Sequence, residues 1–287
     1  MSNNSKKHHY LPQFYLRGFT NEDGTFTVYD KQLKTFRRSK PENEFYEKYR
    51  NTVDIKGEKS LFVEHMYSHL ESTLAPALVS VQKSKHDEPV MTADLIVRLK
   101  FFIETIRWRN PALDNLYSQI IPRLKIQDFG FTLNGASQEA KDRIEKEVMA
   151  DPAMQKMLRP FMGMFGLLNL STNEKNIHKW HILYQEGGFP IIGDFPTIFN
   201  PKGLHDKNNR EVILPLSSSR TIIHANVRSG KELPSTFTID KDLAIMHLSR
   251  RFICCKREDY LKFMVNFYYQ NVNDLEDKFF ENIFENL

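Results

Sequence analysis

The sequence has little cysteine, and its cysteines are poorly placed to form a disulfide that would stabilise the fold. Its 287 residues include two cysteines, which are neighbours at Cys254 and Cys255. Adjacent residues of a β-strand point to opposite faces, so these two thiols make a poor structural disulfide. Small secreted domains that depend on disulfides carry many more cysteines. The pattern predicts a protein of a reducing compartment, and we expect a cytoplasmic one.

Long apolar runs are also missing. The sequence contains no stretch of about 18 uncharged apolar residues, the length that indicates a membrane-spanning helix. The first seven residues, Met1 to Lys7, are polar and basic and lead into no apolar segment of the kind found in secretion signals. These absences predict a soluble intracellular protein that does not enter the membrane.

Several common catalytic signatures are absent. The sequence has no Walker A loop, no glycine fingerprint of dinucleotide-binding folds and no Gly-x-Ser-x-Gly turn. Those motifs cradle phosphates on backbone N–H groups, admit a pyrophosphate, or expose a serine nucleophile. Their absence disfavours P-loop nucleotide hydrolysis, nicotinamide chemistry and serine-hydrolase catalysis.

The composition is that of an ordinary globular protein. Hydrophobic residues make up 40% of the chain and aromatic residues 12%, which is enough to build a core. The 40 Lys and Arg residues against 36 Asp and Glu give a formal charge of +4. A mild positive charge permits contact with nucleic acid without requiring it.

The spacing of apolar residues changes along the chain and predicts an α+β protein. Residues 1–57 carry turn signals between two β-rich runs, which is typical of a hairpin. Residues 58–170 show the three-to-four spacing of helices, and residues 171–287 contain short apolar runs separated by Gly, Pro, Asn and Ser. We therefore expect an N-terminal hairpin, a central helical layer and a C-terminal mixed or antiparallel sheet with helices, folded as a single domain over residues 1–287.

Local signals give several helix boundaries. Thr92 and Ser137 are good N-caps, and Asp151 followed by proline can begin a further helix. Pro76 falls inside a helical stripe, where we expect it to bend or split the helix. The amphipathic, Phe-rich tail at residues 275–284 is predicted to dock on the core or to bind a protein partner or second copy.

The densest chemistry lies in the opening segment, residues 6–19. It combines two adjacent imidazoles, a phenol, an amide and a guanidinium, carried by His8, His9, Tyr10, Gln13 and Arg17. Apolar residues three to four apart within it predict a short helix. We expect this segment to lie in a central cleft, where the rest of the chain converges on it.

Four stretches of the sequence together resemble a known family. They are His-His-Tyr-Leu-Pro-x-Phe-Tyr-Leu-Arg-x-Phe at residues 8–19, Leu-Glu-x-x-Leu-Ala-Pro at 70–76, Arg-Asn-Pro at 109–111 and Leu-Pro-Leu-Ser at 214–217. This set resembles a widespread family of bacterial, phage and occasionally eukaryotic proteins catalogued as a domain of unknown function. At a strand end where that family has Ser-Asp-Asn-Pro, this chain has Gly-Asp-Phe-Pro at 193–196, which keeps Asp194. The resemblance implies no established activity, although a role in defence against phage would suit such a family.

The polar residues of these motifs suggest a phosphodiester-acting site. Imidazoles have a pKa of about 6.5 and are competent bases at neutral pH, and guanidiniums bind phosphate oxygens in pairs. The leading hypothesis is a metal-assisted nuclease-like enzyme in which a divalent cation stabilises charge on the phosphoryl oxygens. Its candidate catalytic groups and metal ligands are His8, His9, Glu71 and Asp194, and its candidate substrate-binding groups are Tyr10, Gln13, Arg17 and Arg109.

Alternatives to this hypothesis remain open at the level of sequence. The two histidines also resemble the entry of HNH-type nucleases, but Asn43, Asn51 and His65 lack the spacing of that motif. The polar set can instead be a structural network in a non-catalytic binding or regulatory protein, for instance with Arg17 and Glu71 as a buried ion pair. In the plainest alternative, the histidines are exposed on a mobile chain end.

Overall fold

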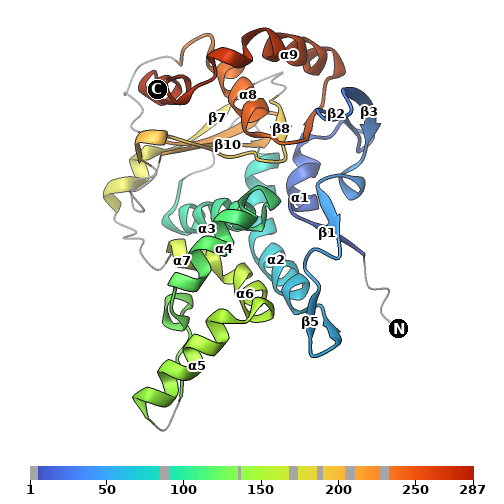
Figure 1. Ribbon diagram of the computed structural model, residues 1–287. Coiled ribbons are helices and arrows are strands. Elements are labelled where there is room, and N and C mark those ends of the chain that lie inside the picture. The colour runs from blue at the N-terminus through green and yellow to red at the C-terminus, as the bar shows by residue number, and fades with distance from the viewer. Residues whose placement is uncertain are drawn as a thin grey trace.

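The computed structural model describes residues 6–84, 91–134, 137–167, 174–185, 190–203, 211–225 and 233–287. Within these ranges the protein combines helices with sheets in an α+β fold, and each pairing between strands is antiparallel (Figure 1). The predicted fold class is therefore confirmed, and the C-terminal sheet follows the antiparallel alternative.

The fold contains two four-stranded sheets, and the first combines strands from both ends of the chain. The first has the order β3-β2-β12-β8 and is built from β3 (Thr35–Ser39), β2 (Phe26–Asp30), β12 (Phe252–Cys255) and β8 (Ile192–Gly193). The second has the order β7-β11-β10-β9 and is built from β7 (Trp180–Tyr184), β11 (Arg220–His224), β10 (Val212–Ser217) and β9 (Ile198–Phe199). The predicted hairpin is present as β2 and β3, and it shares its sheet with the C-terminal strand β12.

These sheets are covered by helices on both faces (Figure 1). Along β10, Leu214 and Leu216 belong to the core that includes α2 and α3, whereas Ile213 belongs to the core that includes α8, α9 and α10. Cys254 and Cys255 divide between the same two cores and are free thiols. Because side chains alternate across a strand, a sheet buried on both faces has continuous apolar strands, which is why these runs stood out in the sequence.

The layer on one side of the sheets consists of the central helices. These helices are α2 (Phe62–Lys83), α3 (Ala93–Arg109), α4 (Asp114–Ile120), α5 (Gln138–Ala150), α6 (Pro152–Leu158) and α7 (Met162–Leu167). The helices on the other side of the sheets are α8 (Phe237–Leu248), α9 (Glu258–Asn271) and α10 (Asp277–Glu285). The predicted caps are confirmed: Thr92, Ser137 and Asp151 each accept a hydrogen bond from a backbone N–H of the following helix. Pro76 lies inside α2 without splitting it.

The opening segment is largely buried in the core. It forms the short strand β1 (Lys7–His9), which pairs with β4 (Tyr46–Lys48), then α1 (Gln13–Leu16) and a 3-10 turn, η1 (Arg17–Phe19). Two strands, β5 (Val53–Ile55) and β6 (Glu58–Ser60), lead from β4 into α2. Tyr15 has no exposed surface, and its hydroxyl donates to the Pro215 carbonyl at 2.6 Å. The predicted burial of this segment is thus observed.

The Phe-rich tail forms α10 and docks on the fold. Phe280, Ile283 and Phe284 are buried in the same core as α8 and α9. Of the two predictions for the tail, docking on the core is therefore the one that the structure shows. Among the described residues, no helix combines the length and the apolar character needed to cross a membrane.

Asp194, which directly follows β8, is hydrogen-bonded to the turn before β12, to β12 itself and to the end of α3. Its carboxylate accepts the backbone N–H groups of Arg250 and Arg251, both at 2.8 Å, and that of Phe252 at 3.1 Å. Its own backbone N–H donates to the Phe252 carbonyl at 2.9 Å, and its carbonyl accepts a hydrogen bond from the Asn110 side chain. The residue therefore fixes the turn between α8 and β12 against the end of α3.

We expect Asp194→Asn to destabilise the protein. The amide replaces one acceptor oxygen by a donor and leaves a buried backbone N–H group without its partner, which costs about 1–3 kcal/mol. Urea unfolding of the purified variant should show this loss in the free energy of unfolding. Asp142→Asn, on the exposed face of α5, is the matched control and should change it by less than about 0.5 kcal/mol; equal stability of the two variants would contradict the structural role of Asp194.

Candidate functional site

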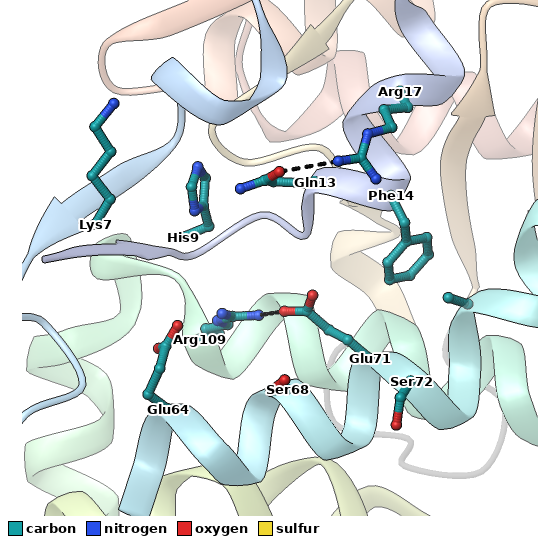
Figure 2. Close-up of a pocket in the computed structure, with 11 residues that line it drawn as sticks. Lys7, His9, Gln13, Phe14, Arg17, Glu64, Ser68, Glu71, Ser72 and Arg109 are labelled. Atoms are coloured by element: carbon teal, nitrogen blue, oxygen red, sulfur yellow. Dashed lines mark hydrogen bonds and ion pairs between the residues drawn. The ribbon is translucent and has the colours of Figure 1, made fainter. Parts of the chain in front are cut away.

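A pocket of about 440 Å³ lies between the opening segment and α2 (Figure 2). The opening segment supplies one wall and α2 supplies the opposite wall, and Arg109 reaches in from the end of α3. The residues that line it are Lys7, His9, Gln13, Phe14, Arg17, Glu64, Ser68, Glu71, Ser72, Ala75 and Arg109. Five of the eight predicted site residues are thus brought together: His9, Gln13, Arg17, Glu71 and Arg109.

The α2 wall is a polar stripe beside the buried apolar face of this helix. Residues three to four apart lie on one face of a helix, and this face carries Glu64, Ser68, Glu71, Ser72 and Ala75. The apolar positions of α2 turn elsewhere and are buried. Of the residues in the polar stripe, the sequence motifs indicated only Glu71 as a site residue. Polar and small residues at i, i+4, i+7, i+8 and i+11 were the signal that would have revealed Glu64, Ser68 and Ser72.

His9 is the buried base of the pocket. Its side chain is 9% exposed, and its Nε2 is buried without a hydrogen-bond partner in the part of the chain that the structure describes. Burial, helped by the positive charge of Arg109, lowers the pKa of His9 to about 4, although a hydrogen bond with the Glu42 backbone and the charge of Glu64 act in the opposite direction. The imidazole is therefore neutral at pH 7, with a nitrogen lone pair or an N–H group that is not engaged by the protein.

Gln13, at the start of α1, and Arg17, directly after α1, lie on the same wall of the pocket as His9. The Arg17 guanidinium donates to the Gln13 side-chain oxygen at 3.2 Å, and the nitrogen end of the Gln13 amide points toward the His9 ring (Figure 2). Lys7 lies on the other side of His9 and donates to the Asn43 side chain at 2.8 Å. On this wall the Gln13 amide thus lies beside the imidazole, and the Arg17 guanidinium follows beyond the amide.

Arg109 is paired with Glu71 across the pocket. Its side chain is 2% exposed, its Nη1 donates to Glu71 Oε1, and its guanidinium lies 4.4 Å from the centre of the Tyr67 ring. The alternative that paired Glu71 with Arg17 is therefore wrong, because α3 ends beside α2 and places Arg109 closer to the carboxylate. Each charge of this pair neutralises the other inside the pocket wall.

His8 lies behind the pocket and supports it. It has no exposed surface, and its Nδ1 accepts the backbone N–H of Asn51 at 2.8 Å. The Asn51 side chain in turn donates to Glu64 at 2.6 Å, so His8 and Asn51 hold a carboxylate of the pocket in place. The alternative of exposed histidines on a mobile end is wrong for both His8 and His9, since β1 pairs with β4 and places them inside.

Besides His8, two further predicted residues lie outside the pocket lining. Tyr10 packs edge-on against Phe45, with ring centres 6.2 Å apart, and its backbone N–H donates to the Phe45 carbonyl at 2.9 Å. Burial and the nearby charge of Asp194 raise the pKa of the Tyr10 phenol. The Asp194 carboxylate is fully engaged by three backbone N–H groups, although burial raises its pKa above the ordinary value. Both residues serve the core in this structure.

The predicted metal ligands do not converge as one set. Of His8, His9, Glu71 and Asp194, only His9 and Glu71 line the pocket. Across the described ranges, no group of three or more His, Cys, Asp or Glu residues has the geometry to hold a metal ion. Asn51, one candidate partner in the HNH comparison, is used instead to fix His8 and Glu64.

Comparison with known proteins gives the family of the chain. A search of curated proteins found no match, and a search of solved structures found none either. A scan against protein-family models matched DUF4238, described as a protein of unknown function, over residues 7–246. The match runs from β1 into α8 and includes every residue that lines the pocket. The chain therefore belongs to the DUF4238 family, as the resemblance of its sequence predicted.

Proposed function

We propose that this protein cleaves phosphodiester bonds in nucleic acid and that the reaction takes place in the pocket between the opening segment and α2. The observation that carries the proposal is the state of His9, a buried neutral imidazole whose Nε2 has no partner within the described residues. Proton transfer at a reacting oxygen requires such an unengaged nitrogen. Phosphate binding requires donors beside it, which Gln13 and Arg17 supply.

Arg17 is the group that binds the phosphate in this proposal. Among the described residues its guanidinium makes one side-chain hydrogen bond, to Gln13, which leaves most of its N–H donors for a ligand. Arg109 has a different role, since it is buried and paired with Glu71. A bidentate contact of Arg17 with two phosphoryl oxygens would place the phosphorus next to His9 on the same wall.

The bound phosphate also adjusts His9 for catalysis. A base with a pKa of about 4 is neutral at pH 7 but accepts a proton weakly. A negative charge placed beside an imidazole favours its protonated form and raises its pKa toward neutrality. His9 then takes the proton of the attacking water as the new P–O bond forms, and the leaving oxygen takes a proton from solvent as the old P–O bond breaks.

The proposal includes a divalent cation in the pocket, and the cleavage assay tests whether the reaction requires it. Glu64 and Glu71 are two carboxylates on one face of α2, and Glu71 is already paired with Arg109. Two carboxylates with water in the remaining positions suit Mg²⁺, which keeps several of its waters when it binds protein. The proposal nevertheless assigns proton transfer to His9, so the role of His9 does not depend on the cation.

The first test is cleavage of single- and double-stranded DNA and RNA, with Mg²⁺, Mn²⁺ or Zn²⁺ or with a chelator. We expect His9→Gln to reduce cleavage by about 10²–10⁴-fold, the usual contribution of a general base. Arg17→Gln should reduce it by about tenfold or more, because a charge-assisted contact to the phosphate is lost. Arg123→Gln, an exposed residue on another part of the surface, is the control and should match the wild type.

Folding of each variant is checked by circular dichroism and urea unfolding before its activity is compared. Absence of cleavage by the folded wild-type protein with every substrate and cation would overturn the proposal. Cleavage that is equal in the wild type and in folded His9→Gln would remove His9 from the reaction.

The lowered pKa of His9 predicts a specific pH dependence of stability. In the unfolded chain the imidazole titrates at 6.5, and in the folded chain at about 4, so protons bind preferentially to the unfolded chain between these values. The stability that His9 contributes is complete above pH 6.5 and is lost as the pH falls toward 4. Between pH 7 and pH 4.5 the wild type should lose about 2–3 kcal/mol more than His9→Asn in urea unfolding. Parallel losses in the two proteins would show that His9 is not buried as a neutral group.

A second candidate function is non-catalytic binding or regulation, with the polar groups as a structural network. The observation that favours it is the mutual pairing of Glu71 and Arg109, which commits two pocket residues to each other. In such a protein the pocket would bind a ligand without transforming it, and the wild type would bind oligonucleotides without cleaving them. The cleavage assay and a binding assay on the same oligonucleotides separate the two functions.

The Glu71–Arg109 pair has its own test. Glu71→Ala leaves the buried guanidinium unpaired and should lower the free energy of unfolding by about 2–3 kcal/mol, somewhat less than for a fully buried pair because Glu71 is 28% exposed. The double variant Glu71→Leu, Arg109→Met removes both charges and should recover most of that loss. A double variant as unstable as Glu71→Ala would show that the charges are not the cause.

A further inference from the structure

A second pocket, of about 210 Å³, lies on the other side of the end of α3 and shares no residue with the His9 pocket. It is formed by the loop between β4 and β5, by α4, and by α6 with the turn that follows it. Its lining includes Arg50, Lys156 and Arg159 together with the carboxylate of Asp114. The proposed cleavage reaction does not take place in this pocket, although Asn51 lines it and also donates to Glu64 of the His9 pocket.

The two guanidiniums of the second pocket are held in fixed orientations. Arg50 is 9% exposed and donates to both oxygens of Asp114, at 3.1 and 2.7 Å. Arg159 is 13% exposed, donates from Nε to the Trp108 carbonyl at 2.6 Å, and pairs with the same Asp114 at 2.6 Å. One carboxylate is therefore shared by two recessed arginines. Guanidiniums immobilised in this way lose little freedom when they bind an anion.

Lys156 adds a third positive charge to the pocket. Its ammonium donates to the Thr52 carbonyl at 2.9 Å, which leaves two further N–H donors. Burial, together with the charges of Arg50 and Arg159, lowers the pKa of Lys156. Burial alone would raise the pKa of Asp114, but the two arginines outweigh it and hold that pKa below its ordinary value. Asp114 is thus ionised at neutral pH, and it balances only one of the three cations.

One further carboxylate, Glu47, lies at the rim of the pocket. Glu47, which is 47% exposed, pairs with Arg50 at 2.8 Å from the rim. Next to the pocket, the Tyr67 hydroxyl is buried without a hydrogen-bond partner in the described residues. Burial raises the pKa of Tyr67, and the charges of Arg159, Arg109 and Arg50 act against this. Tyr67 therefore lies within reach of the charges of three arginines and of Glu64.

We propose that the second pocket is a binding site for a small doubly charged oxyanion, with phosphate or a small phosphate monoester as its ligand. Phosphate carries negative charge to offset the excess of three cations over the lining carboxylate Asp114 and the rim carboxylate Glu47. Its oxygens accept from the remaining N–H donors of Lys156 and Arg159. Sites for drug-sized ligands measure about 300–1,000 Å³, so a pocket of about 210 Å³ suits a small ligand. A nucleic-acid strand is disfavoured because the guanidiniums are recessed instead of spread along a surface.

Calorimetric titration of the full chain with sodium phosphate, in a buffer free of other polyvalent anions, tests the site. Lys156→Gln should weaken phosphate binding by about tenfold or more, because it removes a charged donor. Lys156→Arg keeps the charge and should stay close to the wild type. Lys146→Gln, an exposed lysine of α5, is the matched control and should leave binding unchanged. Arg17→Gln changes only the His9 pocket, so retention of the Lys156-dependent binding in that variant separates this site from the proposed cleavage site.

Two outcomes of the titration would overturn the proposal: no phosphate binding to the wild type, or equal affinities in the wild type and Lys156→Gln. A parallel titration with a short single-stranded DNA identifies the source of the phosphoryl group. A Lys156-dependent loss of DNA binding, with no such loss for free phosphate, would contradict a small-anion site.

A measurement on the wild type covers the case in which Lys156→Gln does not fold. Mild acetylation of the native protein, read by peptide mass spectrometry, reports how reactive each lysine is. Phosphate at saturating concentration should slow the acetylation of Lys156 several-fold and leave that of Lys146 unchanged. Equal reactivity of Lys156 with and without phosphate would overturn the proposal independently of any variant.

Discussion

The end of α3 is the point on which the rest of this structure depends. The last carbonyls of a helix have no partners within the helix and must find them elsewhere. Here the carbonyl of Arg109 accepts from Arg50, and those of Trp108 and Asn110 accept from Arg159. The same few residues send Arg109 into the His9 pocket and the Asn110 side chain to the Asp194 carbonyl. The need to satisfy one helix end thus places charged side chains in two pockets and joins the central helices to the sheets.

The His9 pocket combines burial with polarity because two different elements build it. The opening segment is anchored by apolar side chains that have no exposed surface, Leu11, Tyr15, Leu16 and Phe19. This anchoring carries His9 inside, where loss of water lowers the pKa of its imidazole. The polar stripe of α2 faces it and keeps the space open to hydrophilic ligands. Neither element alone would place an unprotonated base beside carboxylates and guanidiniums.

Local features of the fold were predictable, and long-range roles were not. The caps at Thr92, Ser137 and Asp151 depend on residues at most three positions away, so the sequence shows them directly. Asp194 and His8 were singled out by residue type, but a carboxylate and an imidazole serve equally well to accept backbone N–H groups. Arg17 and Arg109 were both candidates to pair with Glu71, and only the packing of α3 against α2 selected Arg109.

The sequence by itself determined the class of the fold, the hairpin, three helix starts and the membership of a family, and it predicted that the opening segment is buried. These follow from spacing and from short motifs, which are properties of neighbouring residues. Only the tertiary structure decided which polar residues share a pocket, that Glu64 joins them, and that Arg50, Lys156 and Arg159 form a second one. Those groups are far apart in the chain, and their charges, burial and partners exist only after the helices have packed.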